Sequence, residues 1–151
     1  MRSRAVIIKG GEILLVRRIK NGEEYFVFPG GGAEGDEDPV QTLIREVREE
    51  LGLSIYSPRF LFRLEQEDEP SCFFLVTKFS GEPVIGGEEK ERMTPDNQYH
   101  VAWLPIGRAL ALPSLYPEEA KQKLAEILPG INRAEFPEVG PLCPGGPTST
   151  D

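Results

Sequence analysis

Three glutamates stand close together in the first half of the chain: Glu46, Glu49 and Glu50. Residues three or four apart lie on the same flank of a helix, so a helix here would gather all three carboxylates. Carboxylates this close repel one another, and a simple stability argument does not explain them. Mg²⁺ and Mn²⁺ prefer clustered carboxylate oxygens as ligands. The spacing therefore predicts a divalent-cation site.

The flanking residues predict the helix that would position these glutamates, over Pro39–Leu51. Asp38 can cap the free backbone N–H groups of the first turn, and Pro39 suits the first helical position. Gly52 can adopt the left-handed conformation that ends a helix. Apolar residues at helical spacing predict one buried stripe along this helix. They are Val40, Leu43, Ile44, Val47 and Leu51.

Residues beside the glutamates could complete the site. Arg45 lies four residues before Glu49, where it could orient or partly neutralise that carboxylate. The glycines at 30–32 let the backbone approach a ligand, and a carbonyl such as that of Gly31 could serve as a metal oxygen. No Gly-Lys-Ser/Thr follows this loop, so it is not a phosphate cradle of the Walker type. A solvated, Glu-rich helical face is the plain alternative for residues 45–50 taken alone.

The whole segment 31–53 resembles the Nudix box. The match is Gly, five residues, Glu, seven residues, then Arg-Glu-apolar-x-Glu-Glu-x-Gly-apolar. These positions are Gly31, Glu37, Arg45, Glu46, Val47, Glu49, Glu50, Gly52 and Leu53. The chain is therefore similar to the Nudix hydrolases from about residue 4 to residue 128. The resemblance implies an α+β fold, a Nudix-type α/β/α sandwich with a mixed β-sheet.

The resemblance also implies an activity. Nudix hydrolases use water and usually Mg²⁺ to cut a pyrophosphate bond in a nucleoside diphosphate linked to another group. Carried onto this chain, Glu49 and Glu50 are expected as the principal metal ligands, and Glu46 as a ligand or as the base for water. We expect Arg45 in the catalytic set, Gly31 beside the metal, and Mg²⁺ or Mn²⁺ as cofactor.

Many family members recruit a further acidic base from a loop outside the box. Residues 86–100 supply Glu88, Glu89, Glu91 and Asp96, of which Glu89 and Glu91 are the candidates. Each of them also fits an ordinary solvated loop charge.

The residues that would choose the substrate are less distinctive. Arg17 and Arg18 end an expected strand and could meet phosphates, or could be ordinary surface charges. Phe28 could stack on a nucleobase or belong to the core. Pro70 is not clearly in register with the proline that marks ADP-ribose hydrolases. No tyrosine lies where the dinucleoside polyphosphate hydrolases carry one.

The leading expectation is hydrolysis of a nucleoside triphosphate, oxidised forms included, to the monophosphate and pyrophosphate. ADP-ribose or a nucleotide sugar is the alternative substrate. A Nudix domain that senses a nucleotide without cutting it is the alternative of another class. An isomerase of the isopentenyl diphosphate type fits less well, since it would show several metal-binding histidines and this chain has only His100.

Composition limits the remaining choices. The 151 residues fit one domain, and the net charge of −8 argues against a basic surface for a nucleic-acid duplex. No apolar run reaches membrane-spanning length, and two cysteines do not indicate a disulfide framework. We expect a cytoplasmic protein with a small nucleotide-type partner. The family resemblance adds the expectation of a homodimer.

Periodicity predicts the other elements. Strands are expected at 4–9, 12–18, 25–28, 55–66, 71–80 and 99–104, with a hairpin at Gly10 and Gly11. A helical turn is expected at 105–111 and a terminal helix at 117–127. The hydrolase domain is thus expected at residues 1–128. Residues 129–151 hold five prolines and four glycines, which predicts an extended, flexible tail, or one that closes over a neighbouring subunit's site.

Overall fold

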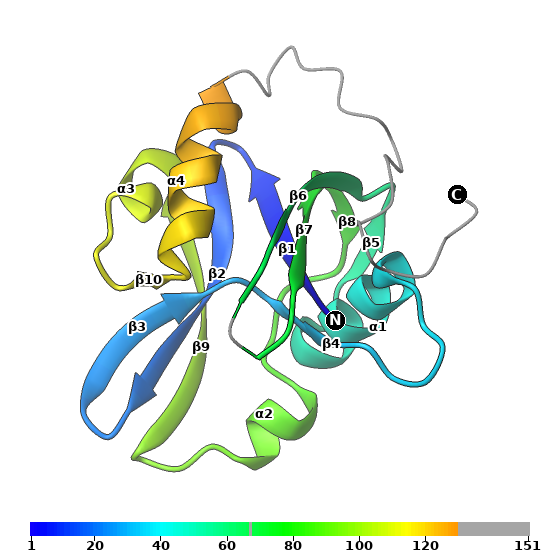
Figure 1. The fold of residues 1–151 in the computed structure, drawn as a ribbon. Coiled ribbons are helices and arrows are strands. Elements are labelled where there is room, and N and C mark those ends of the chain that lie inside the picture. The colour runs from blue at the N-terminus through cyan, green and yellow to red at the C-terminus, as the bar shows by residue number, and fades with distance from the viewer. Residues whose placement is uncertain (67, 130–151) are drawn as a thin grey trace.

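The computed structural model describes residues 1–66 and 68–129. Their main sheet runs β10-β3-β2-β1-β7-β6, while β4 pairs with β1 and β9 pairs with β2 (Figure 1). Its strands are β1 (Arg2–Lys9), β2 (Glu12–Lys20), β3 (Glu23–Val27), β4 (Gly30–Gly32), β6 (Arg59–Leu64), β7 (Ser71–Val76), β9 (Asn97–Pro105) and β10 (Leu115–Tyr116). The β1–β7 and β10–β3 pairs are parallel and the others antiparallel, so the sheet is mixed, as predicted.

Helices cover the two sides of this curled sheet (Figure 1). Helix α1 (Pro39–Leu51) packs on one side, and α3 (Ile106–Leu110) and α4 (Glu118–Ile127) pack on the other. Successive residues of a strand point to opposite faces. Thus Leu14 of β2 joins the cluster under α1, whereas Leu15 joins the cluster under α3 and α4. Two helical layers around a mixed sheet confirm the predicted α/β/α sandwich.

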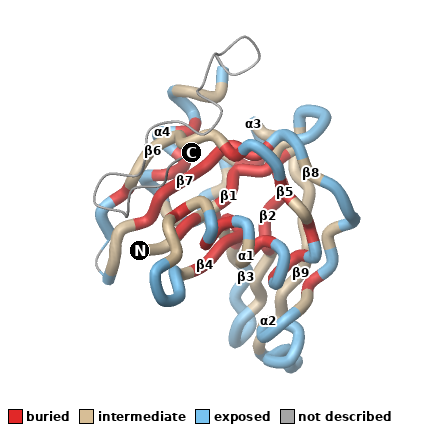
Figure 2. The backbone as a smooth tube through the Cα atoms, turned by 90° about the vertical axis from the view of Figure 1, so that its right-hand side faces the viewer, coloured by how far each residue is buried: buried red, intermediate tan, exposed pale blue. Residues whose placement is uncertain are grey.

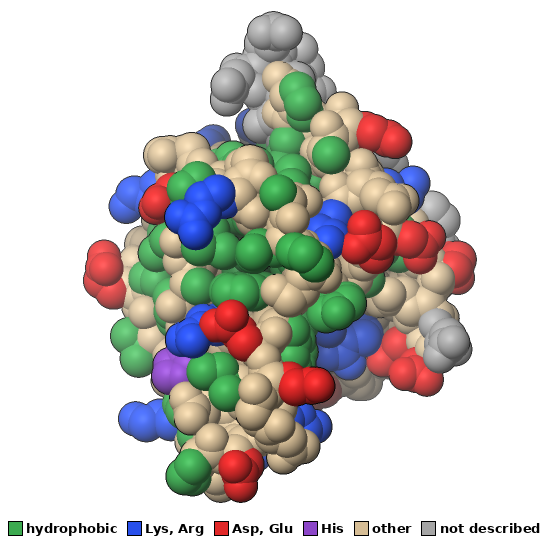
Figure 3. Space-filling view, turned by 90° about the vertical axis from the view of Figure 1, so that its left-hand side faces the viewer, with side chains coloured by type: hydrophobic (Ala, Val, Ile, Leu, Met, Phe, Trp, Pro, Cys, Tyr) green, Lys and Arg blue, Asp and Glu red, His purple; other side chains and the backbone are tan. Residues whose placement is uncertain are grey.

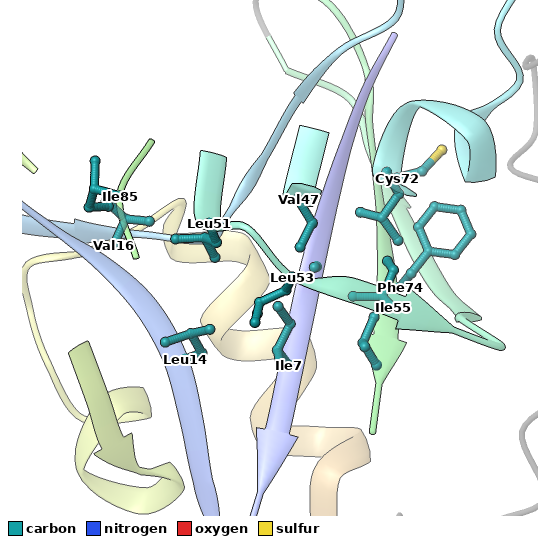
Figure 4. Packing of buried hydrophobic residues seen from close by; sticks show 13 residues of the cluster. Ile7, Leu14, Val16, Val47, Leu51, Leu53, Ile55, Cys72, Phe74 and Ile85 are labelled. Atoms are coloured by element: carbon teal, nitrogen blue, oxygen red, sulfur yellow. The ribbon is translucent and has the colours of Figure 1, made fainter. Parts of the chain in front are cut away.

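The core under α1 is shown in Figure 4. Val47 and Leu51 of α1 lie beside Leu53 and β1 residue Ile7, and all four side chains are fully buried. Figure 2 shows that burial is concentrated in the central strands, while the turns at the far ends of β2, β3 and β9 are exposed. Helix α1 is therefore held in place by a close-packed core.

Two predicted strands are each broken in two. Residues 55–66 form β5 (Ser54–Tyr56) and β6, because Ser57 is left-handed with φ of 51° and Pro58 has no N–H to donate to a ladder. Residues 71–80 form β7 and β8 (Lys78–Ser80). Strands β5 and β8 pair with each other as a separate two-stranded sheet.

The predicted hairpin is confirmed: β1 and β2 pair antiparallel around Gly10 and Gly11, both with positive φ. A second hairpin, β2–β3, turns at left-handed Asn21 and Gly22. Short elements that periodicity did not predict are β4, β10 and α2 (Gly87–Glu91). The predicted tail lies outside the described residues, apart from Pro129.

The surface has mixed charge on the face shown in Figure 3. Hydrophobic side chains gather in the middle of this face, and Lys, Arg, Asp and Glu side chains are interspersed around them. No helix of the described residues is long and apolar enough to cross a membrane.

Candidate active site

Helix α1 begins and ends as its sequence predicts. The Asp38 side chain accepts from Gln41 N at 2.8 Å, the Gln41 side chain accepts from Asp38 N at 3.0 Å, and Pro39 occupies the first turn. Gly52 ends the helix with φ of 71°. The predicted stripe is wrong at Ile44, which is 39% exposed. Glu50 is buried on the packed side instead, because its carboxylate finds a backbone partner there.

The Glu50 carboxylate is only 6% exposed and accepts the backbone N–H of Gly30 at 3.0 Å. Burial raises the pKa of Glu50 to about 7, and the charges of Glu89 and Glu46 add to the rise, while the Gly30 N–H opposes it. A buried carboxylate is costly to ionise unless positive charge accompanies it. Glu50 is therefore suited to meet a cation.

Glu46 lies directly against the Gly-rich loop. A Cβ added to Gly31 would lie 2.6 Å from Oε1 of Glu46, closer than real Cβ atoms approach. At Gly30, which has φ of 138°, a Cβ would overlap the carbonyl oxygen of Ser3 on β1. Partial burial raises the pKa of Glu46, although Arg45 opposes the rise. The glycines are needed here because α1 and β1 leave no room for a side chain.

Arg45 connects the loop to the acidic helix. Its Nε donates to Oε2 of Glu37 at 2.6 Å, and its Nη2 donates to Oε1 of Glu37 at 3.0 Å and to the Gly32 carbonyl at 2.9 Å. Its Nη1 donates to Glu46 and Glu49, at 3.2 Å each. Arg45 thus orients two of the three clustered carboxylates, as its spacing predicts for Glu49.

Glu37 supports the loop. Its Oε1 accepts from the backbone N–H of Glu34 at 2.9 Å and from the Thr42 hydroxyl at 3.0 Å. The hydrogen bond from Arg45 is the main reason that the pKa of Glu37 falls to about 2. Glu37 is consequently ionised, and its hydrogen bonds connect the loop to α1.

Helix α2 faces α1 across an acidic cavity. The segment before α2 docks on the last turn of α1, where Val84 N donates to Leu51 O and Gly86 N donates to Glu50 O, both at 2.9 Å. A cavity of about 410 Å³ lies between the helices. Its lining is Glu34, Glu46, Glu49, Gly87, Glu88, Glu89 and Glu91. The structure therefore brings both loop-base candidates, Glu89 and Glu91, opposite the predicted ligands.

The donor set suits a hard divalent cation. Six of the seven lining residues are glutamates and none is basic, and the pKa values of Glu46 and Glu50 are raised by burial and by neighbouring carboxylates. Clustered oxygen donors fit Mg²⁺ or Mn²⁺, which would offset this repulsion. The described side chains do not already converge as a metal-binding group of three or more acidic, His or Cys residues. Glu49, 58% exposed, points toward Arg45, and Glu50 points toward Gly30.

Residues 1–127 match the family model of the NUDIX domain. The chain belongs to the Nudix family. It is a Nudix hydrolase, as the box predicts.

Two relatives by sequence and one solved structure agree with this assignment. The chain is 24% identical over 143 residues to an RNA pyrophosphohydrolase of Marinomonas sp. (strain MWYL1), covering 82% of this chain and 86% of the relative. It is 35% identical over 89 residues to an 8-oxo-dGTP diphosphatase of Haemophilus influenzae, covering 54% and 63%. A MutT NUDIX hydrolase from Burkholderia pseudomallei has the same fold, with a TM-score of 0.64, 24% identity, and coverage of 83% and 95%.

The three substrate contacts expected in this Nudix hydrolase, Arg17, Arg18 and Phe28, do not lie together in one environment. Arg17 forms an exposed ion pair with Glu24. Arg18 lies on the other face of β2, with its guanidinium 3.8 Å from the centre of the Tyr99 ring. Phe28 is buried, and its ring packs edge-on against Phe73. The Phe28 ring therefore serves the core.

One residue near the site was not singled out in the sequence. Arg4 of β1 is largely buried, and burial lowers its pKa to about 10 although Glu50 and Glu46 raise it. Its Nη1 donates to Phe28 O at 3.1 Å and to Gly30 O at 3.3 Å. No local signal marks Arg4, because its burial depends on segments far away in the chain.

Proposed function

We propose that this Nudix hydrolase cuts a nucleoside triphosphate into the monophosphate and pyrophosphate, with Mg²⁺ as cofactor and Mn²⁺ as a substitute. The observation that carries the proposal is the cavity between α1 and α2, because its acidic lining contains box residues on one side and Glu89 and Glu91 on the other. A triphosphate is anionic, and it would meet this acidic cavity only together with cations.

The chain's own residues have separate roles in this proposal. Glu46, Glu49 and Glu50 would hold the cation, together with the carbonyl of Gly31. Arg45 holds Glu46 and Glu49 in place through Nη1. Bound Mg²⁺ supplies charge neutralisation of the phosphate oxygens and lowers the pKa of water.

We assign the base to Glu89. The charge of Glu89 raises the pKa values of both Glu46 and Glu50. Glu91 is not among the charges that raise them, so of the two loop candidates Glu89 interacts more strongly with these carboxylates. Glu89 takes a proton from water while the water oxygen forms a bond to phosphorus. The P–O bond of the anhydride breaks, and pyrophosphate leaves with the electron pair.

A substrate panel tests the proposal. The purified protein is incubated with Mg²⁺ and each substrate, and pyrophosphate and phosphate release are measured. The panel contains nucleoside triphosphates, oxidised nucleotides, ADP-ribose, nucleotide sugars, dinucleoside polyphosphates and 5′-triphosphate RNA. We expect the highest kcat/KM with a nucleoside triphosphate, and no release by Glu50→Gln.

Other outcomes would redirect or reject the proposal. Faster release from ADP-ribose or a nucleotide sugar would establish the alternative substrate. Faster release from 5′-triphosphate RNA would match the name of the Marinomonas relative. Binding of nucleotides without turnover, measured by calorimetry with Mg²⁺ present, would establish a sensing domain instead.

A further inference from the structure

Arg4 has hydrogen-bond donors that the protein does not use. Only Nη1 has protein partners, the carbonyls of Phe28 and Gly30. Within residues 1–66 and 68–129, no fully buried side-chain nitrogen or oxygen lacks a partner. Because Nε and Nη2 of Arg4 have no partner in this part of the chain, neither atom is fully buried. A largely buried guanidinium that presents two donors is arranged for an external acceptor.

Arg4 also lines a small cavity. Its volume is about 220 Å³, and its lining is Arg4, Val27, Phe28, Gln66, Tyr116 and Pro117. This volume is below the roughly 300–1,000 Å³ of sites that enclose a drug-sized ligand, so the cavity takes one part of a nucleotide. Three of its six lining residues, Val27, Tyr116 and Pro117, are apolar or aromatic and not fully buried, whereas the Phe28 side chain is only 1% exposed. Such walls suit a flat ring, whereas a phosphate would lose its hydration against them.

The cavity adjoins the candidate active site through the Gly-rich loop. Gly30 accepts from Arg4 through its carbonyl and donates to Glu50 through its N–H. Glu50 and Glu46 are both among the charges that act on Arg4. Gly30 therefore contacts both Arg4, which lines this cavity, and Glu50 of α1.

The chemistry of the donors indicates which ring. Nε and Nη2 of an arginine form a planar fork that matches two neighbouring acceptors. The O6 and N7 atoms of guanine are such a pair, whereas adenine presents an amino donor beside its N7. We propose that Arg4 is a specificity-determining residue that selects a guanine base in this cavity by donating to O6 and N7. The inference rests on the proposed function only for its choice of a nucleotide ligand.

Binding of monophosphates tests this inference separately from hydrolysis. Affinities for GMP, AMP and 7-deaza-GMP, which lacks the N7 acceptor, are measured by calorimetry on the full chain with Mg²⁺. We expect the wild type to bind GMP roughly tenfold or more tighter than AMP or 7-deaza-GMP. 8-oxo-GMP carries a hydrogen on N7 and is expected to bind like 7-deaza-GMP.

Variants separate recognition from a structural role of Arg4. Arg4→Met should bind all four monophosphates with similar, weak affinity, and Arg4→Lys should recover only part of the preference. Arg63→Met is the matched control, because Arg63 is partly buried and pairs with Glu65, and neither residue lines this cavity. Its preference for GMP should equal that of the wild type.

Several results would overturn the inference. Equal wild-type affinities for GMP and 7-deaza-GMP would do so without any variant, and so would absence of GMP binding. An unchanged preference for GMP in Arg4→Met would also do so. GMP selectivity without triphosphate cleavage would reject the proposed function alone, and cleavage without base preference would reject this inference alone.

Discussion

Gly31 lies under the Glu46 carboxylate, so that a Cβ on Gly31 would come within 2.6 Å of Glu46 Oε1. Gly31→Ala should therefore push Glu46 out of position. A displacement of about 1 Å at a reacting group can cost on the order of 100-fold in rate, and we expect a fall of that size in kcat. Steady-state kinetics with Mg²⁺ and the best substrate of the panel measure it.

Gly32→Ala is the control for this prediction. A Cβ on Gly32 would meet only Nη1 of Arg2, at 3.7 Å, which is ordinary contact. Its kcat should stay within a few-fold of the wild type, and its thermal unfolding midpoint should be unchanged. A similar loss of activity in both variants would show that the loop, and not the position of Glu46, limits the rate.

Glu50 should make the metal-free protein less stable as pH rises. Because burial raises its pKa to about 7 from an ordinary 4.5, the native state holds a proton that the unfolded state releases. The cost is absent below about pH 4.5, grows between the two values, and is fully present above pH 7. It amounts to roughly 3 kcal/mol. Glu50→Gln should remove it.

Thermal unfolding in EDTA between pH 5 and pH 9 measures this effect. Glu50→Gln should have the higher midpoint at pH 8, and the difference should shrink toward pH 5. Added Mg²⁺ should raise the wild-type midpoint more than that of the variant, because a cation stabilises the ionised carboxylate. A lower midpoint of Glu50→Gln in EDTA at pH 8 would contradict the prediction.

Glu37 should act in the opposite direction. Since the hydrogen bond from Arg45 lowers its pKa to about 2, ionised Glu37 stabilises the native state. This contribution is fully present above about pH 4.5 and is lost as pH falls toward 2. Glu37→Gln should therefore unfold at lower urea concentration than the wild type at pH 7.

Urea unfolding at pH 7, 5 and 3.5 tests this contribution. The difference between wild type and Glu37→Gln should be equal at the two higher values and smaller at pH 3.5. Glu24→Gln is the control, because Glu24 forms an exposed ion pair with Arg17. An exposed pair contributes about 1 kcal/mol or less, so this variant should change stability little.

Glu89 and Glu91 can be told apart by kinetics. Glu89→Gln should lower kcat by about 100-fold or more, the usual effect of removing a positioned base. Glu91→Gln should change kcat by less than about threefold. The rate of Glu89→Gln should also lose its dependence on the deprotonation of a base in a pH profile. Comparable rates in the two variants would remove Glu89 from the mechanism.

Local rules predicted α1 and its ends well, because capping by Asp38 and the stop at Gly52 depend on adjacent residues only. They failed where distant segments decide. Strand β4 is three glycines held by pairing with β1, and no side chain indicates such pairing in the sequence. Ile44 fits the apolar period but lies at the edge of the packed side, where the neighbouring elements leave it exposed.

In the site, too, some features depend on adjacent residues and others on distant segments. The spacing of Glu46, Glu49 and Glu50 placed them on one helix, yet their burial differs because Gly30 offers Glu50 a backbone N–H. The docking of residues 84–86 on α1 also depends on tertiary contacts. Arg4 illustrates the limit most clearly, since its cavity joins residues from positions 4, 28, 66 and 116.

The two hydrogen bonds from Val84 and Gly86 to the last turn of α1 separate the site into a constant part and an exchangeable part. They are made by backbone atoms, so they do not depend on the side chains beyond Gly87. Residues 90–96, which follow the proposed base Glu89, could then be replaced or lengthened without moving the carboxylates of α1. In an engineered or diverging enzyme, this segment is the place where substrate range can change while the reaction stays the same.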